Sequence, residues 1–195
     1  MCSSDLAAAA RPFRPVSDAM LANPDAGDWL MWRRTWNGWG YSPLTQIDRK
    51  NVGKLKQVWS HELVKGTQEG TPLVHDGVMY VPNPGDDIQA FDAKTGKLLW
   101  EYKRQYPEGV NGGTNRTMAI WGTMLIDAGA DNMMYAVDAR NGKLVWETKV
   151  LEPKLPARAS AGPIVANGKV ITGRQCQPAA TSDSCIITAH DAATG

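Results

Sequence analysis

One phrase occurs three times in this chain of 195 residues. It reads FDAKTGKLLW at 91–100, VDARNGKLVW at 137–146 and HDAATG at 190–195. The three aspartates in the phrase are 46 and 53 positions apart. Periods of about this size are typical of solenoids, propellers and other arrays, because each repeat buries its apolar face against the next one. The repeat therefore restricts the fold to a series of similar units.

Within each repeat the pattern predicts short antiparallel strands. The stretches LVHDGVMYV and IVANGKVIT alternate or run apolar and contain valine, isoleucine and tyrosine. Asp76-Gly77, Asn141-Gly142 and Asn167-Gly168 are hairpin signals, because a type I′ turn needs positive φ at both central residues. No window has a strong helical period. We therefore predict an all-β fold, a partial β-propeller in which each repeat forms one blade.

The repeated phrase also predicts two local contacts. Asp92 is placed to accept hydrogen bonds from the backbone of the turn that follows it. A tryptophan recurs near the end of each unit, at Trp59, Trp100 and Trp146. Large aromatic side chains bury much apolar area, so we expect these tryptophans to pack between blades rather than against a cofactor.

Composition excludes several classes of function. The formal net charge is +1, with 43% hydrophobic and 21% charged residues, so there is no basic face for nucleic acid. No apolar run approaches the ~18 residues that a membrane-spanning helix needs. The sequence contains no phosphate-binding GxxxxGK[ST] loop, no CxxCH haem attachment and no GxSxG nucleophile elbow.

The first residues are set apart from the domain. MCSSDL resembles translated adapter sequence, and we expect residues 1–22 to be this non-native scar and an unstructured lead-in. The same stretch has no long apolar core of a signal peptide. Residues 23–195 are predicted to be the propeller domain, incomplete because the last repeat stops before its final strand.

Cysteines and histidines give weaker signals. Cys176 and Cys185 flank a polar loop, and a hairpin there would bring them within disulfide reach, which suits an oxidising compartment. Two free thiols or an unfinished metal site are the alternatives, although the absence of a CxxC pair disfavours zinc. The histidines are far apart in sequence, and His75, beside the Asp76-Gly77 turn, is expected to be exposed to solvent.

Longer stretches of the chain resemble a known family. NPDAGDWLMWRRTWNGWGYSPLTQIDRKNVGKLKQVWSHEL, QEGTPLVHDGVMYV and TNRTMAIWGTMLI are similar to the start of pyrroloquinoline quinone (PQQ)-dependent alcohol dehydrogenases, the quinoprotein methanol/ethanol dehydrogenase family. The resemblance covers about residues 23–195. It implies the N-terminal blades of an eight-bladed propeller that holds PQQ and a calcium or lanthanide ion near its axis.

The resemblance also implies an activity. Family members are oxidoreductases that oxidise a primary or secondary alcohol in the periplasm and pass the electrons to a cytochrome c. The catalytic base and most metal ligands of the family pattern have no counterpart within these residues, so we expect this chain alone to be inactive. A non-catalytic propeller that binds a partner protein or a small molecule is the alternative.

Three residues match the family's cofactor contacts. Glu69 in QEGTPL matches a glutamate that hydrogen-bonds the cofactor rim, and Arg116 in TNRTMA matches an arginine that faces the quinone oxygens and carboxylates. Ser160 matches a threonine that contacts a cofactor carboxylate. The alternatives are a solvated loop charge, a surface arginine and a turn serine.

Two departures mark a divergent branch of the family. Val110 and Asn111 stand where the methanol and ethanol enzymes have adjacent cysteines that form a disulfide over the cofactor. Pro178 or Ala180 stands where they have a metal-binding glutamate. Asp183 is the only carboxylate in that loop, and it is either a replacement oxygen ligand for the metal or a solvated side chain.

Overall fold

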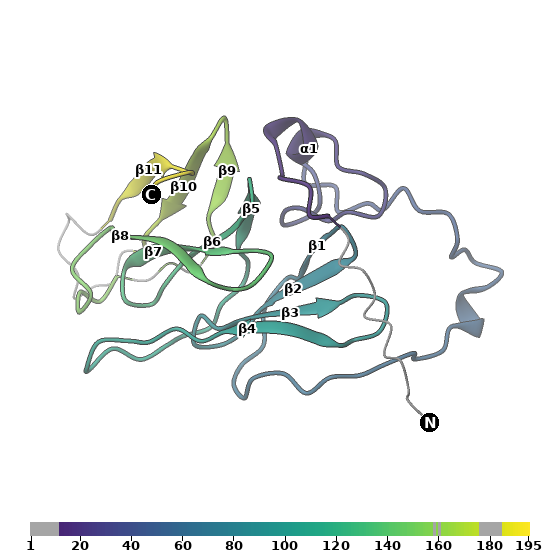
Figure 1. Cartoon of the computed structure of the whole chain (residues 1–195), viewed down its shortest axis with the longest axis horizontal. Helices are drawn as coiled ribbons and strands as arrows, with labels where there is room; N and C mark the ends of the chain where they lie inside the picture. Colours follow the sequence, from purple (N-terminus) through teal and green to yellow (C-terminus); the bar gives the residue numbers. More distant parts are fainter. Residues whose placement is uncertain (1–11, 158, 160, 176–184) are drawn as a thin grey trace, which may run out of the picture.

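The chain folds into three antiparallel sheets that follow one another along the sequence (Figure 1). The computed structural model describes residues 12–157, 159, 161–175 and 185–195. Within these ranges there are eleven strands, one short α-helix and one turn of 3₁₀-helix. The all-β prediction and the assignment of one repeat to one blade are confirmed.

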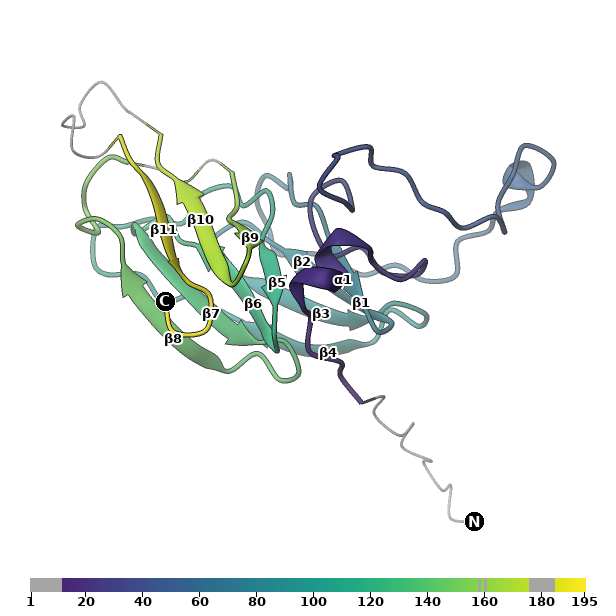
Figure 2. The ribbon, with the colours of Figure 1, turned by 90° about the horizontal axis from the view of Figure 1, so that it is seen from above.

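Each sheet is one blade, and neighbouring strands in the sequence are neighbours in the sheet. Blade 1 contains β1 (Leu73–His75), β2 (Val78–Pro82), β3 (Ile88–Asp92) and β4 (Leu98–Tyr102). Blade 2 contains β5 (Ala119–Trp121), β6 (Met124–Ala128), β7 (Met133–Asp138) and β8 (Leu144–Lys149). Blade 3 contains β9 (Ile164–Ala166), β10 (Lys169–Gly173) and β11 (Ile187–Asp191). The first strands of blades 2 and 3, β5 and β9, lie side by side in both views (Figures 1 and 2).

Two of the three predicted hairpin turns have the expected geometry. Asp76 and Gly77 have φ of 50° and 79°, and Asn167 and Gly168 have φ of 50° and 66°. The third prediction is wrong, because only Gly142 of the Asn141-Gly142 pair has positive φ. That turn is longer, and it closes through the bond from the Gly142 amide to the Asp138 carbonyl at 2.8 Å.

Aspartates of the repeated phrase hold the turns that follow them. Oδ1 of Asp92 accepts from the Thr95 amide at 2.7 Å and from the Lys94 amide at 3.1 Å. Oδ1 of Asp191 accepts from the Ala193 amide at 3.0 Å. The predicted role of Asp92 is confirmed.

The recurring tryptophans pack against a glycine in the turn of the next repeat. The pairs are Trp59 with Gly96, Trp100 with Gly142 and Trp146 with Gly195. A Cβ atom on Gly96 would lie 2.5 Å from the Trp59 ring, and one on Gly142 would lie 2.6 Å from the Trp100 ring. Trp100 Nε1 also donates to the Ala139 carbonyl at 3.1 Å. The tryptophans are therefore contacts between blades, as predicted.

Residues 12–22 differ from the prediction of an unstructured lead-in. Val16 forms an isolated antiparallel bridge with Gly122 in blade 2. The helix α1 (Asp18–Ala22) follows, and it begins where the Ser17 side chain accepts from the Met20 amide. Val16 and Leu21 are each 2% exposed. The prediction was wrong for this segment because its apolar side chains complete the core of blades 1 and 2, a contact that the local sequence does not show.

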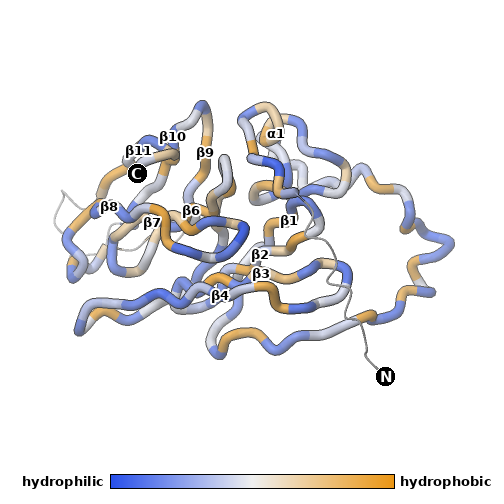
Figure 3. The backbone as a smooth tube through the Cα atoms, in the orientation of Figure 1, coloured by the Kyte–Doolittle hydropathy of each residue, from blue (hydrophilic) through white to orange (hydrophobic). Residues whose placement is uncertain are grey.

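Between residues 31 and 63 the chain runs outside the sheets and includes η1 (Val52–Lys54) (Figures 1 and 3). It carries exposed apolar side chains, of which Trp39 is 78% and Val58 is 83% exposed. Exposed apolar patches of this kind mark surfaces that another part of a protein or a partner covers. Among the described residues, no helix has the length and apolar content for a membrane crossing.

The tryptophan–glycine contact predicts the effect of Gly142→Ala in the full-length protein. Gly142 has φ of 72° and no room for a Cβ atom beside Trp100, so alanine both strains the backbone and displaces the ring. We expect a loss of about 2–3 kcal/mol in the free energy of unfolding, measured in urea. Gly168→Ala is the matched control, since φ is 66° but the nearest ring atom is at 3.8 Å, and it should lose only about 1 kcal/mol. Equal losses in the two variants would contradict the contact's role.

Candidate functional site

A polar cavity of about 780 Å³ lies where the connections after β2, β4, β6 and β8 meet. These connections follow even-numbered strands of antiparallel sheets, so they lie at the same end of the blades. The longest wall comes from the loop between β4 and β5. The lining residues are Asp86, Gly109, Val110, Asn111, Gly112, Gly113, Thr114, Arg116, Ala128, Ala130, Pro153, Lys154, Leu155, Pro156, Ala157, Ala159 and Gln175.

Glu69 and Arg116 are brought together at this cavity. Arg116 Nη2 lies 2.8 Å from Glu69 Oε2, and the two side chains are 47% and 41% exposed. The Thr71 amide donates to the Arg116 carbonyl at 2.7 Å, which holds the two segments side by side. Both residues were predicted from separate motifs, and the fold places them as one ion pair with Arg116 in the cavity wall.

Behind Arg116 lies a buried carboxylate. Asn115 Nδ2 donates to Asp127 Oδ2 at 2.5 Å, so the residue next to Arg116 is anchored in blade 2. Burial, with a further contribution from the nearby charge of Asp86, raises the pKa of Asp127 to about 8. Burial also raises the pKa of Asp86, which is 4% exposed. One carboxyl group in the cavity wall, that of Asp86, and one buried behind Arg116, that of Asp127, therefore disfavour ionisation.

The remaining predicted site residues are only partly covered by the structure. Ser160, Asp183 and Cys176 lie outside the described residues, so the cofactor contact, the metal ligand and the Cys176–Cys185 disulfide stay predictions. Val110 and Asn111, which replace the family's cysteine pair, line the cavity. So do Ala159, next to Ser160, and Gln175, next to Cys176.

The donor set of the cavity suits a planar ligand with carbonyl and carboxylate oxygens. Arg116 offers a planar fork of donors, and Asn111 and Thr114 offer neutral ones. A Cβ atom on Gly113 would meet nothing within 4 Å, so this wall is open toward the cavity. The residues present therefore fit PQQ, whose chemistry needs such donors.

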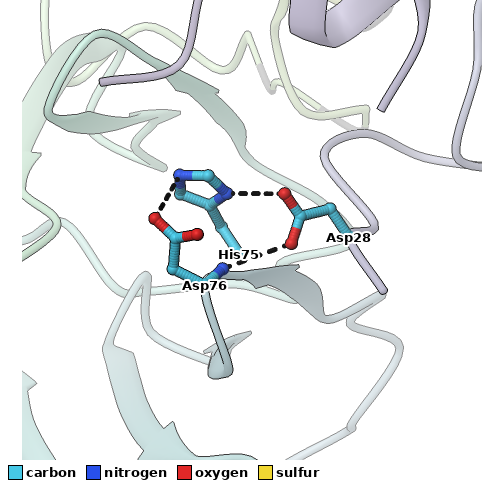
Figure 4. Close-up of side chains that lie close together, drawn as sticks. All are labelled: Asp28, His75 and Asp76. Carbon is cyan, nitrogen blue, oxygen red and sulfur yellow. Dashed lines mark hydrogen bonds and ion pairs between the residues drawn. The ribbon is translucent and has the colours of Figure 1, made fainter. Parts of the chain in front are cut away.

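A second cluster, Asp28 with His75 and Asp76, joins the N-terminal segment to blade 1 (Figure 4). His75 Nδ1 lies 2.9 Å from Asp28 Oδ2, and Nε2 lies 2.7 Å from the Arg14 carbonyl and 3.2 Å from Asp76 Oδ2. His75 is 0% exposed, so the prediction that it faces solvent is wrong. It is buried because the Arg14 and Asp28 segments cover the β1–β2 hairpin.

This cluster has the residue types of a metal site but is satisfied without one. Its three ligand atoms lie within 4.8 Å of one another. However, the Arg14 guanidinium already lies 2.6 Å from Asp76 Oδ1 and 3.5 Å from Asp28 Oδ2. Both nitrogens of the His75 ring already have protein oxygens as partners, from Asp28, Asp76 and the Arg14 carbonyl. We interpret the cluster as a structural clamp.

Blades joined by tryptophan contacts, with a polar cavity at one end, define part of a β-propeller with a candidate ligand site. The chain belongs to the PQQ family, because the model described as "Glucose/ethanol/alcohol dehydrogenase, beta-propeller domain" matches residues 29–195. The predicted family is therefore confirmed.

Known relatives are similar over most of this chain. The dehydrogenase subunit of the quinone alcohol dehydrogenase of Komagataeibacter europaeus is 37% identical over 186 residues, which are 89% of this chain and 25% of that protein. The solved structure of quinohemoprotein alcohol dehydrogenase ADHIIG from Pseudomonas putida HK5 is 32% identical with a TM-score of 0.79, covering 93% of this chain and 28% of that one. A europium-containing methanol dehydrogenase is 26% identical with a TM-score of 0.76, covering 88% and 31%. The chain thus spans about a quarter of the length of the curated relatives it matches.

Asp127 predicts a pH dependence of stability in the full-length protein. An aspartate ionises near pH 4 in an unfolded chain, and Asp127 ionises at about 8 in the fold. Between these values the folded protein holds a proton that the unfolded chain releases, so the free energy of unfolding falls as pH rises. Asp127→Asn should flatten this fall by up to about 1.4 kcal/mol per pH unit, measured by urea unfolding from about pH 5 to about pH 8. Parallel profiles for the parent and the variant would contradict the assignment.

The clamp predicts the effect of His75→Phe. Phenylalanine keeps the ring but leaves Asp28, which is 6% exposed, without its closest partner. We expect a loss of about 3–5 kcal/mol in the free energy of unfolding and faster amide exchange over residues 12–30. The control is His61→Phe, at an exposed histidine that contacts Phe91 edge-on at 4.6 Å and has no such carboxylate. Unchanged exchange over 12–30 in His75→Phe would refute the clamp.

Proposed function

We propose that residues 23–195 are the N-terminal blades of a PQQ-dependent alcohol dehydrogenase that oxidises a primary or secondary alcohol. The observation that carries this proposal is the Glu69–Arg116 ion pair at 2.8 Å, with Arg116 in the wall of a polar cavity. The names of the relatives, which are quinone and quinohemoprotein alcohol dehydrogenases, support it.

Each residue of the pair has a distinct task in this proposal. Arg116 would hold PQQ by donating to its quinone and carboxylate oxygens, because a planar guanidinium forms paired bonds with such groups. Glu69 orients the guanidinium and partly balances its charge before the cofactor enters. When bound, PQQ supplies a quinone that accepts a hydride equivalent from the alcohol carbon.

Further parts of the proposal concern residues and partners outside the described structure. Ser160 would contact a cofactor carboxylate, and Asp183 would be a ligand of a calcium or lanthanide ion. The europium in the related methanol dehydrogenase supports a metal of this kind. We also propose a periplasmic protein that passes electrons to a cytochrome c, and the haem of the related quinohemoprotein supports that route.

Replacing Arg116 with alanine tests the proposal in the full-length protein. The change removes a charge-assisted interaction worth about 1.5–3 kcal/mol, so PQQ should bind roughly ten- to a hundredfold more weakly. Binding to the metal-free and metal-loaded protein can be measured by quenching of tryptophan fluorescence.

The control is Arg140→Ala. Arg140 is also ion-paired, with Asp138 at 2.5 Å, and is 54% exposed, but it lies in the β7–β8 turn away from the cavity. PQQ affinity should not change in this variant. If the parent protein does not bind PQQ, the alternative of a non-catalytic binding propeller replaces the proposal.

A further inference from the structure

The cavity walls include two loops that connect one blade to the next. The first interblade loop, residues 103–118, joins β4 to β5. The second interblade loop, which joins β8 to β9, is continuously described over residues 150–157. The first contains Gly109, Gly112 and Gly113 within five positions. Glycine has more backbone freedom than any other residue, so a fixed loop of this composition needs anchors.

A single turn of blade 1 supplies the anchors of the first interblade loop. Asp86 Oδ2 accepts from the Tyr106 hydroxyl, which also lies 2.9 Å from the Gly85 carbonyl. The Gly85 amide donates to the Gly113 carbonyl at 2.9 Å. Gly112 packs so closely on Gly85 that it has no room for a side chain. Gly85 and Asp86 therefore hold the loop at Tyr106, before the glycine-rich stretch, and at Gly112 and Gly113, at its end.

Asp86 also reaches the opposite wall of the cavity. The same oxygen, Oδ2, accepts from the Ala130 amide in the β6–β7 turn at 2.7 Å. Tyr135 Oη donates to the Asp86 carbonyl at 2.8 Å. Asp86 is only 4% exposed. This residue therefore links the β2–β3 turn of blade 1 to the β6–β7 turn of blade 2 and to the interblade loop between them.

The next repeat has a buried polar residue in the equivalent place, and it also bonds an interblade loop. Asn132 lies 46 positions after Asp86, the spacing of the repeat, and the two residues have φ of 60° and 59°. Asn132 is 0% exposed, and its Nδ2 donates to the carbonyls of Glu152 and Leu155 at 3.1 and 3.0 Å. These carbonyls belong to the second interblade loop, which also lines the cavity.

We propose that Asp86 and Asn132 are positioning residues that hold the two interblade loops closed around the cavity and so set how fast a bound ligand leaves. The ligand is PQQ, so this part rests on the proposed function. Neither residue needs to touch the ligand for this role. Positive φ favours glycine, asparagine and aspartate at both positions, and of these only aspartate and asparagine have a side chain that can bond the loops.

The test compares matched variants of the full-length protein. Asp86→Gly removes the acceptor without backbone strain, whereas Asp86→Asn keeps an acceptor oxygen and tolerates the same φ. We expect PQQ to dissociate about tenfold faster or more from Asp86→Gly and at nearly the parent rate from Asp86→Asn. Asn132→Gly should also dissociate PQQ faster than the parent.

A second measurement and a control distinguish loosening of the loop from a general loss of stability as the cause of faster dissociation. In the PQQ-free protein, amide exchange over 109–114 should rise in Asp86→Gly and return to the parent level in Asp86→Asn. Gly168→Ala strains the β9–β10 turn, which follows an odd-numbered strand and so lies at the end of blade 3 away from the cavity. It should lower the free energy of unfolding but leave the dissociation rate unchanged. Dissociation is measured well below the melting temperature of every variant.

The outcomes separate this inference from the proposed function. Parent-like exchange and parent-like dissociation in Asp86→Gly would overturn the positioning role. A parent protein that fails to bind PQQ would overturn the proposed function, and amide exchange over 109–114 would then still decide whether Asp86 holds the loop.

Discussion

The arrangement of the blades depends on the contact between a tryptophan ring and a glycine backbone in the next repeat. Because glycine has no side chain, the ring lies directly on the backbone of the turn, and its indole N–H bonds a carbonyl of the same turn in the pairs that start at Trp59 and Trp100. A planar ring packed against a backbone restricts the angle at which neighbouring blades can lie. That angle in turn brings the connections after β2, β4 and β6 to a common cavity. The distant residues Glu69 and Arg116 meet because the blades are set in this way.

The sequence predicted the features that repeat and missed those that depend on a single distant partner. The blades, the Asp92 turn and the tryptophan contacts follow from a phrase written three times. The burial of His75 does not, because its partners Asp28 and Arg14 are 47 and 61 positions away. Near His75 the sequence shows only an Asp-Gly turn, which is normally exposed. Residues 12–22 were misjudged for the same reason.

The role of Asp86 could be predicted from the sequence only in part. The local sequence PGDD reads as a solvated turn, and the burial of Asp86 comes from Tyr106 and Ala130 on other connections. A signal was nevertheless present, since aspartate and asparagine stand at equivalent positions 46 residues apart, and both tolerate positive φ. Arg116 and Glu69 were found through the family resemblance rather than through periodicity. No pattern in the sequence showed that Arg116 and Glu69 form an ion pair with each other.

The N-terminal segment has a mechanical consequence. The Arg14 amide bonds Asp76 in the first hairpin of blade 1 at 2.9 Å, and Val16 pairs with Gly122 in the first hairpin of blade 2. Only Pro15 lies between these attachments, and an extended chain advances at most about 7 Å over two positions. Such a short strap cannot stretch, so blades 1 and 2 cannot tilt apart unless one attachment breaks.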